Sequence, residues 1–310
     1  MADPSTAFIP AFQNLIVPLF QTDPISLREA VRSRVITGKS DHWDRIGGTS
    51  LQQVTSRHQN TPYTPSVLSR RRLTLNDWAG SERLDKLDEV KMMIDPRNEM
   101  TQNLLMAWRR VVASTLVTAF NASAVSVSNV EATTSVSLPS SQVISNGGTG
   151  FTVAKLRQVN RILDNAGVPR DGQRHILVSA FAIEDLMADS QVTSADYSSM
   201  NALMNGGAGL INTGTFMGFQ WHMISDAVPD DTAVLTGGTA APILPKSGNI
   251  RTCYAWHKSA MGLSIGKEAT VEVDRLPEHL NLWQVLVQGS LGATRILDAG
   301  VVTVDIDESV

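Results

Sequence analysis

The chain has 310 residues, of which 42% are apolar and 18% charged, so it can bury a sizeable core in one elaborate domain or two modest ones. Its net charge of −4 argues against a general nucleic-acid-binding role for the chain as a whole. The single cysteine, Cys253, excludes a disulfide framework and is better explained as a small core side chain than as a nucleophile.

Residues 1–45 predict an extended arm. In MADPSTAFIPAFQNLIVPLF the apolar residues are interrupted by Pro4, Pro10 and Pro18. The segment has neither a basic start nor an unbroken apolar run, which excludes a signal peptide or a membrane span. It therefore needs another surface to lie on. Residues 26–35 (SLREAVRSRV) predict one short helix, which opens with a serine and a glutamate at capping-box spacing.

The segment from Gly47 to Asn76 predicts a long two-stranded ribbon, with SLQQVTSRH and SVLSRRRLTLN as strands and QNTPYTP as the tip. Too little of it is apolar for the ribbon to be stable alone, so we expect it to pack outside its own subunit. Strand alternation places Arg70 and Arg72 on one face and Arg71 on the other. A neighbour's carboxylates, packaged phosphate or plain solvation are the alternatives for these arginines.

The clearest predicted helix spans residues 96–121. Asp95 is a good N-cap and Pro96 suits the first helical position. Apolar residues then recur at helical spacing: Met100, Leu104, Trp108, Val111, Val112, Leu116, Ala119 and Phe120. At about 1.5 Å per residue the helix would span roughly 39 Å, long enough to be a backbone for the fold.

The remaining residues predict a mixed region that ends in strands. Residues 122–150 alternate as strand pieces ending in a glycine loop, and 151–166 predict a second helix. Further predicted elements are a buried strand at 175–179 that leads into a short helix, a strand at 219–224, and a linker marked by Pro242, Pro245 and Gly248. The closing strands are RTCYAWHKSAMGLSI, ATVEVDRL, LWQVLVQGSLGATRIL and AGVVTVDID.

This order of elements resembles the tailed-phage (Hong Kong 97-type) capsid family. HQNTPYTPSVLSRRRLTLNDWAGSERLDKLDEVKMMIDPRNEM resembles its hairpin-into-spine region, and RHILVSAFAIEDLMAD the first strand and helix of its axial domain. GLINTGTFMGFQWHMISDAVP resembles a later axial segment. CYAWHKSAMGLSIGKEATVEV and GATRILDAGVVTVDID resemble the closing strands of its peripheral domain. No single motif is sharp; their joint order over most of the chain carries the resemblance.

The resemblance implies an α+β fold in five parts. These are an N-terminal arm (1–45), an E-loop hairpin (46–78), a peripheral domain with the spine helix (79–150), an axial domain (151–250) and the return strands of the peripheral domain (251–310). The family forms pentamers and hexamers through its axial domains, and its arms and E-loops reach neighbouring subunits.

The resemblance also implies a function: the major capsid protein of a tailed bacteriophage, made in the host cytoplasm and located in the virion. Such a protein catalyses nothing and uses no cofactor, metal or membrane. Its implied partners are copies of itself, a portal protein, and packaged double-stranded DNA bound without sequence specificity. A decoration protein is a further candidate. A separate scaffolding protein is expected because the arm begins near Met1, which leaves no room for the long N-terminal extension of many relatives.

Candidate contact residues are the aromatics of the arm, the basic and aromatic residues of the hairpin, and the acidic residues after it: Phe8, Phe12, Phe20, Arg57, Tyr63, Arg70, Arg71, Arg72, Asp85, Asp88 and Glu89. The covalent lysine–asparagine link of the family's type member is not expected, because the hairpin 46–78 contains no lysine.

Two other classes of function stay open. An encapsulin-type bacterial compartment shares this architecture but holds an enzyme cargo. A serine hydrolase would use Ser264, which lies in a G-x-S-x-G pattern with Asp274 and His279 further along. The pattern is followed by an alternating strand rather than a helix, which disfavours that alternative. The scattered histidines lack metal-ligand spacing, and His175 and His222 are expected to be satisfied core or interface groups.

Overall fold

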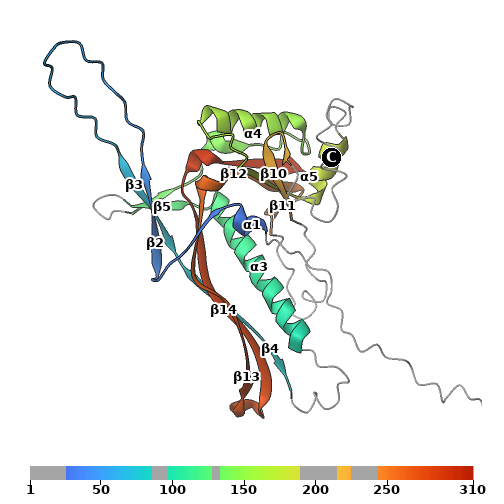
Figure 1. The fold of residues 1–310 in the computed structure, drawn as a ribbon. Helices are drawn as coiled ribbons and strands as arrows, with labels where there is room; N and C mark the ends of the chain where they lie inside the picture. Colours follow the sequence, from blue (N-terminus) through green and yellow to red (C-terminus); the bar gives the residue numbers. More distant parts are fainter. Residues whose placement is uncertain (1–25, 86–96, 128–132, 189–214, 225–242, 310) are drawn as a thin grey trace, which may run out of the picture.

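The computed structural model describes residues 26–85, 97–127, 133–188, 215–224 and 243–309. In Figure 1 a sheet flanked by helices forms one end of the molecule, a long β arm and a long helix extend from it, and a loop projects to the side. No helix of these residues combines the length and apolar character needed to cross a membrane.

The long arm is a four-stranded sheet whose strand order is β1-β13-β14-β4. Its strands are β1 (Arg32–Val35), β13 (Met261–Leu276), β14 (Leu282–Arg295) and β4 (Asn76–Leu84). Helix α3 (Arg97–Asn121) lies along this sheet, where Leu104 packs with Val287. A Cβ added at Gly289 would lie 2.3 Å from the indole of Trp108, so this position needs glycine for helix and sheet to approach.

The second sheet has seven strands, in the order β7-β15-β12-β8-β10-β9, with β11 paired to β12. They are β7 (Val143–Ile144), β15 (Val301–Asp307), β12 (Ile250–His257), β8 (Arg174–Val178), β10 (Phe219–Met223), β9 (Thr215–Phe216) and β11 (Lys246–Ser247). Helices α4 (Val153–Asn165) and α5 (Ala180–Ala188) share the core on one face, which includes Ile176. Leu177 faces the opposite core, with α3 and the short helix α1 (Ser26–Glu29). Through this alternation β8 contributes to both cores.

A smaller sheet, ordered β2-β3-β5-β6, carries the projecting loop. Its strands are β2 (Ser40–Ile46), β3 (Leu68–Thr74), β5 (Ala124–Val127) and β6 (Thr133–Val136). Short 3₁₀ turns complete the connections: η2 (Ser140–Gln142), η3 (Lys258–Ala260), η4 (Pro277–His279) and η5 (Asp298–Gly300).

The helices with the strongest sequence patterns are confirmed. The helix predicted for 96–121 is α3, and the one predicted for 151–166 is α4. At the start of α4, the Thr152 side chain accepts a hydrogen bond from the backbone N–H of Lys155. At its end Gly167 takes a φ of 70°, which favours glycine.

The helix predicted for residues 26–35 is wrong beyond its first turn. Residues 32–35 instead form β1, which pairs in parallel with β13 from Arg32↔Gly262 to Val35↔Ile265. Backbone pairing to a strand far along the chain outweighs the local helical pattern there.

The predicted ribbon is also shifted. Its paired strands are β2 and β3, so the outgoing strand ends at Ile46, before the segment predicted to form it. The predicted linker at 242–248 is in part the hairpin of β11 and β12, with Gly248 at a φ of 61°. Residue 242 lies outside the described residues.

The return strands do not all lie in one sheet. β13 and β14 lie in the four-stranded sheet, but β12 and β15 lie in the seven-stranded sheet beside β8. The predicted boundary at residue 251 therefore falls within the seven-stranded sheet, because β12 pairs with both β15 and β8.

Candidate subunit-contact surfaces

The loop between β2 and β3, residues 47–67, projects from the body of the molecule (Figure 1). It contains no helix or strand. At its base the backbone N–H of Gly47 donates to the carbonyl of Val67 (2.7 Å), and the Thr49 hydroxyl donates to the carbonyl of Thr64 (3.3 Å). The loop is thus closed at its base, and almost all of its side chains face solvent.

Apolar side chains are left uncovered along this loop. Leu51 is 94% exposed, Tyr63 87% and Val54 66%. At the base, Ile46 and Leu68 are also exposed. Several large apolar side chains are thus exposed on one projecting loop, which makes the loop a candidate contact surface. The sequence-based expectation that this segment finds too little packing in its own subunit agrees with these exposures.

The base of the loop is held rigidly by buried arginines. Arg71, only 1% exposed, forms an ion pair with Asp298, and the Nε of Arg295 donates to the same carboxylate (2.6 Å). Arg295 also donates to the carbonyls of Phe120 (2.8 Å) and Ala122 (3.0 Å). Burial lowers the pKa of Arg71, and Asp298 opposes that effect. β3 is therefore fastened to the end of α3 and to the turn after β14.

Arg71, one of the predicted contact candidates, is buried in the subunit, and its guanidinium is paired there with Asp298. The predicted alternation itself is confirmed: Arg70 and Arg72 are exposed and Arg71 is buried. Arg70 pairs with Asp44 on the neighbouring strand, and its Nε lies 2.5 Å from the carboxylate. Arg72 is exposed on the same face as Arg70.

The other contact candidates divide between two groups. Arg57 and Tyr63 lie exposed on the loop, and Asp85 is half-buried just after β4. The remaining candidates lie outside the described residues: Phe8, Phe12, Phe20, Asp88 and Glu89.

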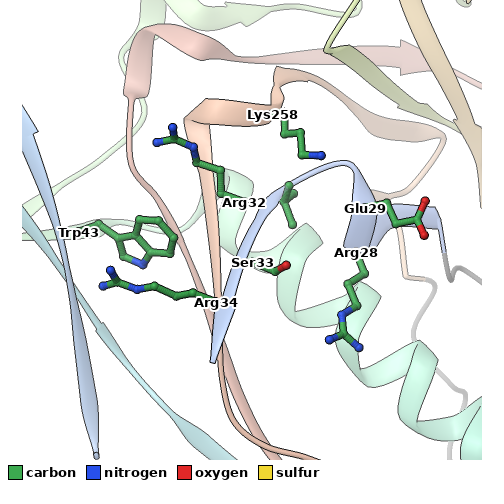
Figure 2. A pocket seen from close by; sticks show the side chains of 8 residues that line it. Arg28, Glu29, Arg32, Ser33, Arg34, Trp43 and Lys258 are labelled. Atoms are coloured by element: carbon green, nitrogen blue, oxygen red, sulfur yellow. The ribbon is translucent and has the colours of Figure 1, made fainter. Parts of the chain in front are cut away.

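A second open surface lies beside β1 and was not found from the sequence. A cavity of about 870 Å³ lies there. Figure 2 shows the basic side chains that line it, Arg28, Arg32, Arg34 and Lys258. β1 is the edge strand of its sheet, and all four of its residues are exposed. An exposed strand edge offers backbone groups with which another chain can pair. In the sequence, the arginines of LREAVRSRV indicate a basic surface, but the same segment also predicts a helix.

Two of the residues that line this cavity, Arg34 and Trp43, also belong to a polar cluster that contains Ser264. The Ser264 hydroxyl donates to Asp41, and the Trp43 indole N–H donates to the Ser264 oxygen (3.3 Å). Arg34 donates to Asp41 through Nε (2.7 Å) and lies over the Trp43 ring, 4.2 Å from its centroid. Burial raises the pKa of Asp41, but hydrogen bonds from Arg34 and Ser264 outweigh it and hold the pKa below its usual value.

The serine-hydrolase alternative is wrong in its geometry. Ser264 lies in the middle of a strand, is fully buried and donates to a carboxylate, whereas a nucleophile elbow exposes the serine at a strand-to-helix turn. Asp274 lies ten residues further along the same strand, roughly 30 Å away at the usual rise. We expect a fluorophosphonate probe to leave Ser264 unlabelled in the folded chain. Stoichiometric labelling detected by peptide mass spectrometry would contradict this.

The two histidines expected in the core form a contact pair. Nδ1 of His175 lies 3.0 Å from Nε2 of His222, and both rings stack against Trp256 at centroid distances of 5.7 and 6.0 Å. The Trp256 indole N–H donates to the carbonyl of Ala30 (2.9 Å). The pair therefore supports the contact of α1 with the seven-stranded sheet. Burial lowers the pKa of His175 to about 3 and that of His222 to about 4.

This pair predicts a loss of stability in acid. In the unfolded chain both imidazoles bind protons near their ordinary pKa of 6.5, but in the folded chain only near 4 and 3. Above pH 6.5 the contribution of the two neutral imidazoles to the free energy of unfolding is therefore complete. It is lost as the pH falls below 6.5, because the unfolded chain then binds protons that the folded chain does not. At pH 5 the loss should be about 2 kcal/mol for each imidazole. Denaturant titrations at pH 7.5 and pH 5 measure the free energy of unfolding. Between these two pH values it should fall less in the His175→Gln/His222→Gln variant than in the wild type. An equally steep fall in the variant would assign the effect to other groups.

Comparison with known proteins adds two findings. A family model described as phage capsid protein matches residues 5–308. Among curated proteins no sequence matches.

The fold is similar to those of solved phage capsids. The capsid of Ralstonia phage GP4 has a TM-score of 0.69 at 9% identity, over 99% of this chain and 96% of that one. The head of Helicobacter pylori bacteriophage KHP40 has a TM-score of 0.68 at 12% identity, over 99% of this chain and 97% of that one. The capsid of the cyanophage P-SCSP1u has a TM-score of 0.67 at 15% identity, over 97% of this chain and 93% of that one. The resemblance noted in the sequence is confirmed.

Proposed function

The chain belongs to the phage capsid protein family, and we propose that copies of it assemble as pentamers and hexamers into the icosahedral shell of a tailed bacteriophage, as its major capsid protein. The shell encloses the double-stranded DNA genome. The role is structural and non-catalytic, and the chain's place is the virion after synthesis in the host cytoplasm.

The observation that supports this assembly is the loop 47–67. Its apolar side chains have no cover in the subunit, while its base is fastened by Arg71 and Asp298. A rigid base with an uncovered apolar loop suits a contact that a neighbouring copy completes. Burying one such side chain contributes about 1.5–3 kcal/mol. A closed shell repeats the contact in every subunit, so modest individual contacts add up to a stable particle.

The proposed division of the chain keeps the ranges predicted from the sequence and changes one of them. Residues 1–45 are the arm and 46–78 the projecting hairpin; the sequence-based axial range, 151–250, gains β12 and β15 from the seven-stranded sheet. The four-stranded sheet β1-β13-β14-β4 and helix α3 form the peripheral region. Because β12 belongs to the same sheet as β8, the boundary predicted at residue 250 falls within one sheet.

Portal, scaffolding and decoration proteins are proposed as further partners on the family resemblance alone. The encapsulin alternative shares the shell but differs in its contents.

Electron microscopy of the purified chain tests the proposal. We expect closed icosahedral particles, and particles isolated from the native source should contain genome-length DNA. A chain that stays monomeric at high concentration and in all salt conditions would contradict a shell role. Particles that hold one cargo protein and no genome would decide for the compartment alternative.

A further inference from the structure

The outer edge of β1 presents backbone groups that the subunit does not pair. β1 bonds in parallel to β13 on one side and to no described strand on the other. Just after β1, the backbone N–H of Ile36 donates to the carbonyl of Ile265 on β13 (2.9 Å). Backbone groups point to opposite edges at successive residues, so those of Ser33 and Val35 face away from β13. No described residue bonds to these outward groups, and a further strand can pair with them.

The cavity of about 870 Å³ beside this edge carries open positive charge. Of the four cations that line it, Arg28 and Arg34 already form ion pairs within the subunit. Arg32 and Lys258 form no ion pair with any described residue. Glu29 is the one carboxylate among the described lining residues, and in Figure 2 it points away from Arg32. The unmatched charge is thus concentrated at Arg32 and Lys258.

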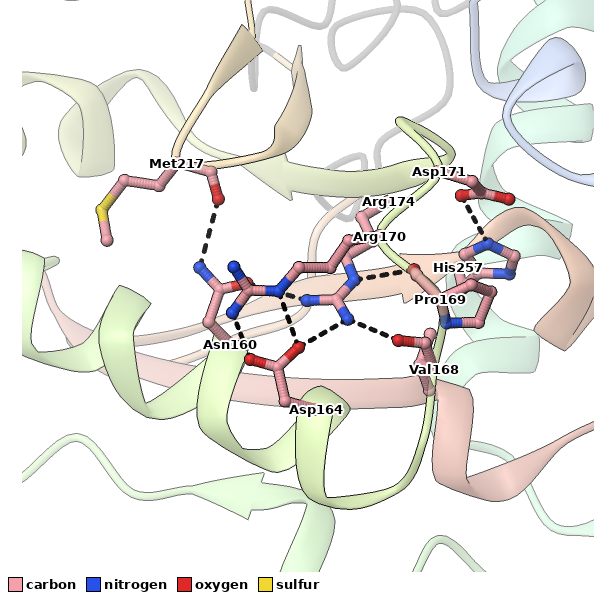
Figure 3. A network of polar contacts seen from close by, with 9 residues as sticks. All are labelled: Asn160, Asp164, Val168, Pro169, Arg170, Asp171, Arg174, Met217 and His257. Atoms are coloured by element: carbon pink, nitrogen blue, oxygen red, sulfur yellow. Dashed lines mark hydrogen bonds and ion pairs between the residues drawn. The ribbon is translucent and has the colours of Figure 1, made fainter.

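The turn that carries Lys258 is held in place before any partner binds. Lys258 begins η3, which lies beside β1, and its backbone N–H donates to the carbonyl of Gln173 (3.0 Å). The preceding His257 accepts a hydrogen bond from the backbone N–H of Ser259 through Nδ1 (3.2 Å). Its Nε2 lies 3.0 Å from the carboxylate of Asp171 (Figure 3). The cation is therefore presented at the edge by a fixed piece of backbone.

The two faces of β1 differ in chemistry, which indicates the kind of partner. Arg32 and Arg34 point towards the side of Trp43, whereas Ser33 points to the other side (Figure 2). Val35 shares the face of Ser33 by strand alternation and is 69% exposed. A peptide strand with carboxylates at every second position and apolar residues between them matches both faces. A nucleic acid has no peptide backbone with which to continue the sheet.

We propose that the edge of β1 binds an extended acidic segment of a second protein, which joins the sheet as a further strand and places carboxylates beside Arg32 and Lys258. At about 3.3 Å per residue, the four residues of β1 offer roughly 13 Å of edge, which suits a short motif. Main-chain hydrogen bonds supply affinity in this mode of binding, and the side chains supply specificity. The proposal concerns the single subunit and does not depend on the shell function.

The first test measures the charge contribution. A fluorescent eight-residue peptide of alternating glutamate and valine is bound to the unassembled full-length chain and followed by anisotropy. We expect Arg32→Gln/Lys258→Gln to weaken binding roughly tenfold, because two charge pairs at a partly exposed site are lost. The matched control, Arg72→Gln/Arg83→Gln, removes the same charge from exposed strand positions and should bind like the wild type.

The second test measures the backbone contribution. Ser33→Pro removes the outward N–H but leaves the bonds to β13, a position at which an edge strand tolerates proline. We expect it to weaken binding at least about tenfold, whereas Ser33→Ala keeps the N–H and should bind like the wild type. Circular dichroism melting checks each variant. Should Ser33→Pro fail to fold, a peptide with N-methyl groups at alternate residues tests the same bonds on the wild-type chain, and it should bind at least about tenfold more weakly.

Four results would overturn the proposal. Equal weakening in both charge variants would mean that overall charge binds the peptide. Unchanged binding by folded Ser33→Pro would mean that no strand is added at this edge. A DNA duplex that binds where the peptide does not, and is lost in Arg32→Gln/Lys258→Gln, would assign the basic lining to nucleic acid. Self-association that Ser33→Pro abolishes, with no peptide binding, would assign the edge to a second copy of the chain.

Discussion

Replacing Leu51, Val54 and Tyr63 together with serine is expected to abolish closed particles while leaving the subunit folded. The three side chains are 94%, 66% and 87% exposed, so the isolated chain loses almost no buried apolar surface. At each contact between copies, however, the substitutions remove about 1.5–3 kcal/mol per side chain. Since a shell repeats every contact many times, a loss of this size should shift the equilibrium entirely to free subunits or capsomers.

The measurement combines electron microscopy with sedimentation, and circular dichroism melting follows the subunit. A matched control keeps the number and location of the changes: Gln52→Ser/Gln53→Ser/Thr61→Ser alters the same loop without removing apolar side chains. The control should assemble like the wild type. Normal shells from the apolar triple variant would show that the loop is not a principal contact.

The second large effect is expected at Arg71, and it concerns folding rather than assembly. Arg71→Glu places a carboxylate in a site that is 1% exposed and beside Asp298, so a buried attraction becomes a repulsion. Breaking a buried ion pair by changing one partner usually costs about 3–5 kcal/mol. That is a large part of a typical free energy of unfolding, about 5–15 kcal/mol.

Arg72→Glu is the control for this prediction, because the neighbouring side chain has the same chemistry but is exposed. Its free energy of unfolding should stay within about 0.5 kcal/mol of the wild type. Denaturant titration of both variants separates the two arginines. Equal and small effects would contradict the buried role of Arg71, and recovery of stability in Arg71→Glu/Asp298→Arg would support the pairing directly.

The elements with a local signal could be predicted from the sequence. The helix at 97–121 follows from apolar residues at helical spacing behind a proline start, and the long closing strands follow from runs of alternating β-branched residues. The uncovered loop also follows from composition, because a segment so poor in apolar residues cannot build its own core. Each of these features depends on residues that lie close together in the sequence.

The features that join distant parts of the chain could not be predicted from the sequence, because they depend on the fold. β1 is a strand because β13, more than two hundred residues away, offers it a backbone edge. Arg71 is buried beside Asp298, which lies 227 positions further along the chain. Pairings of this kind leave no periodic trace in the sequence, since the partners are chosen by the packing of whole sheets and helices and not by their neighbours along the chain.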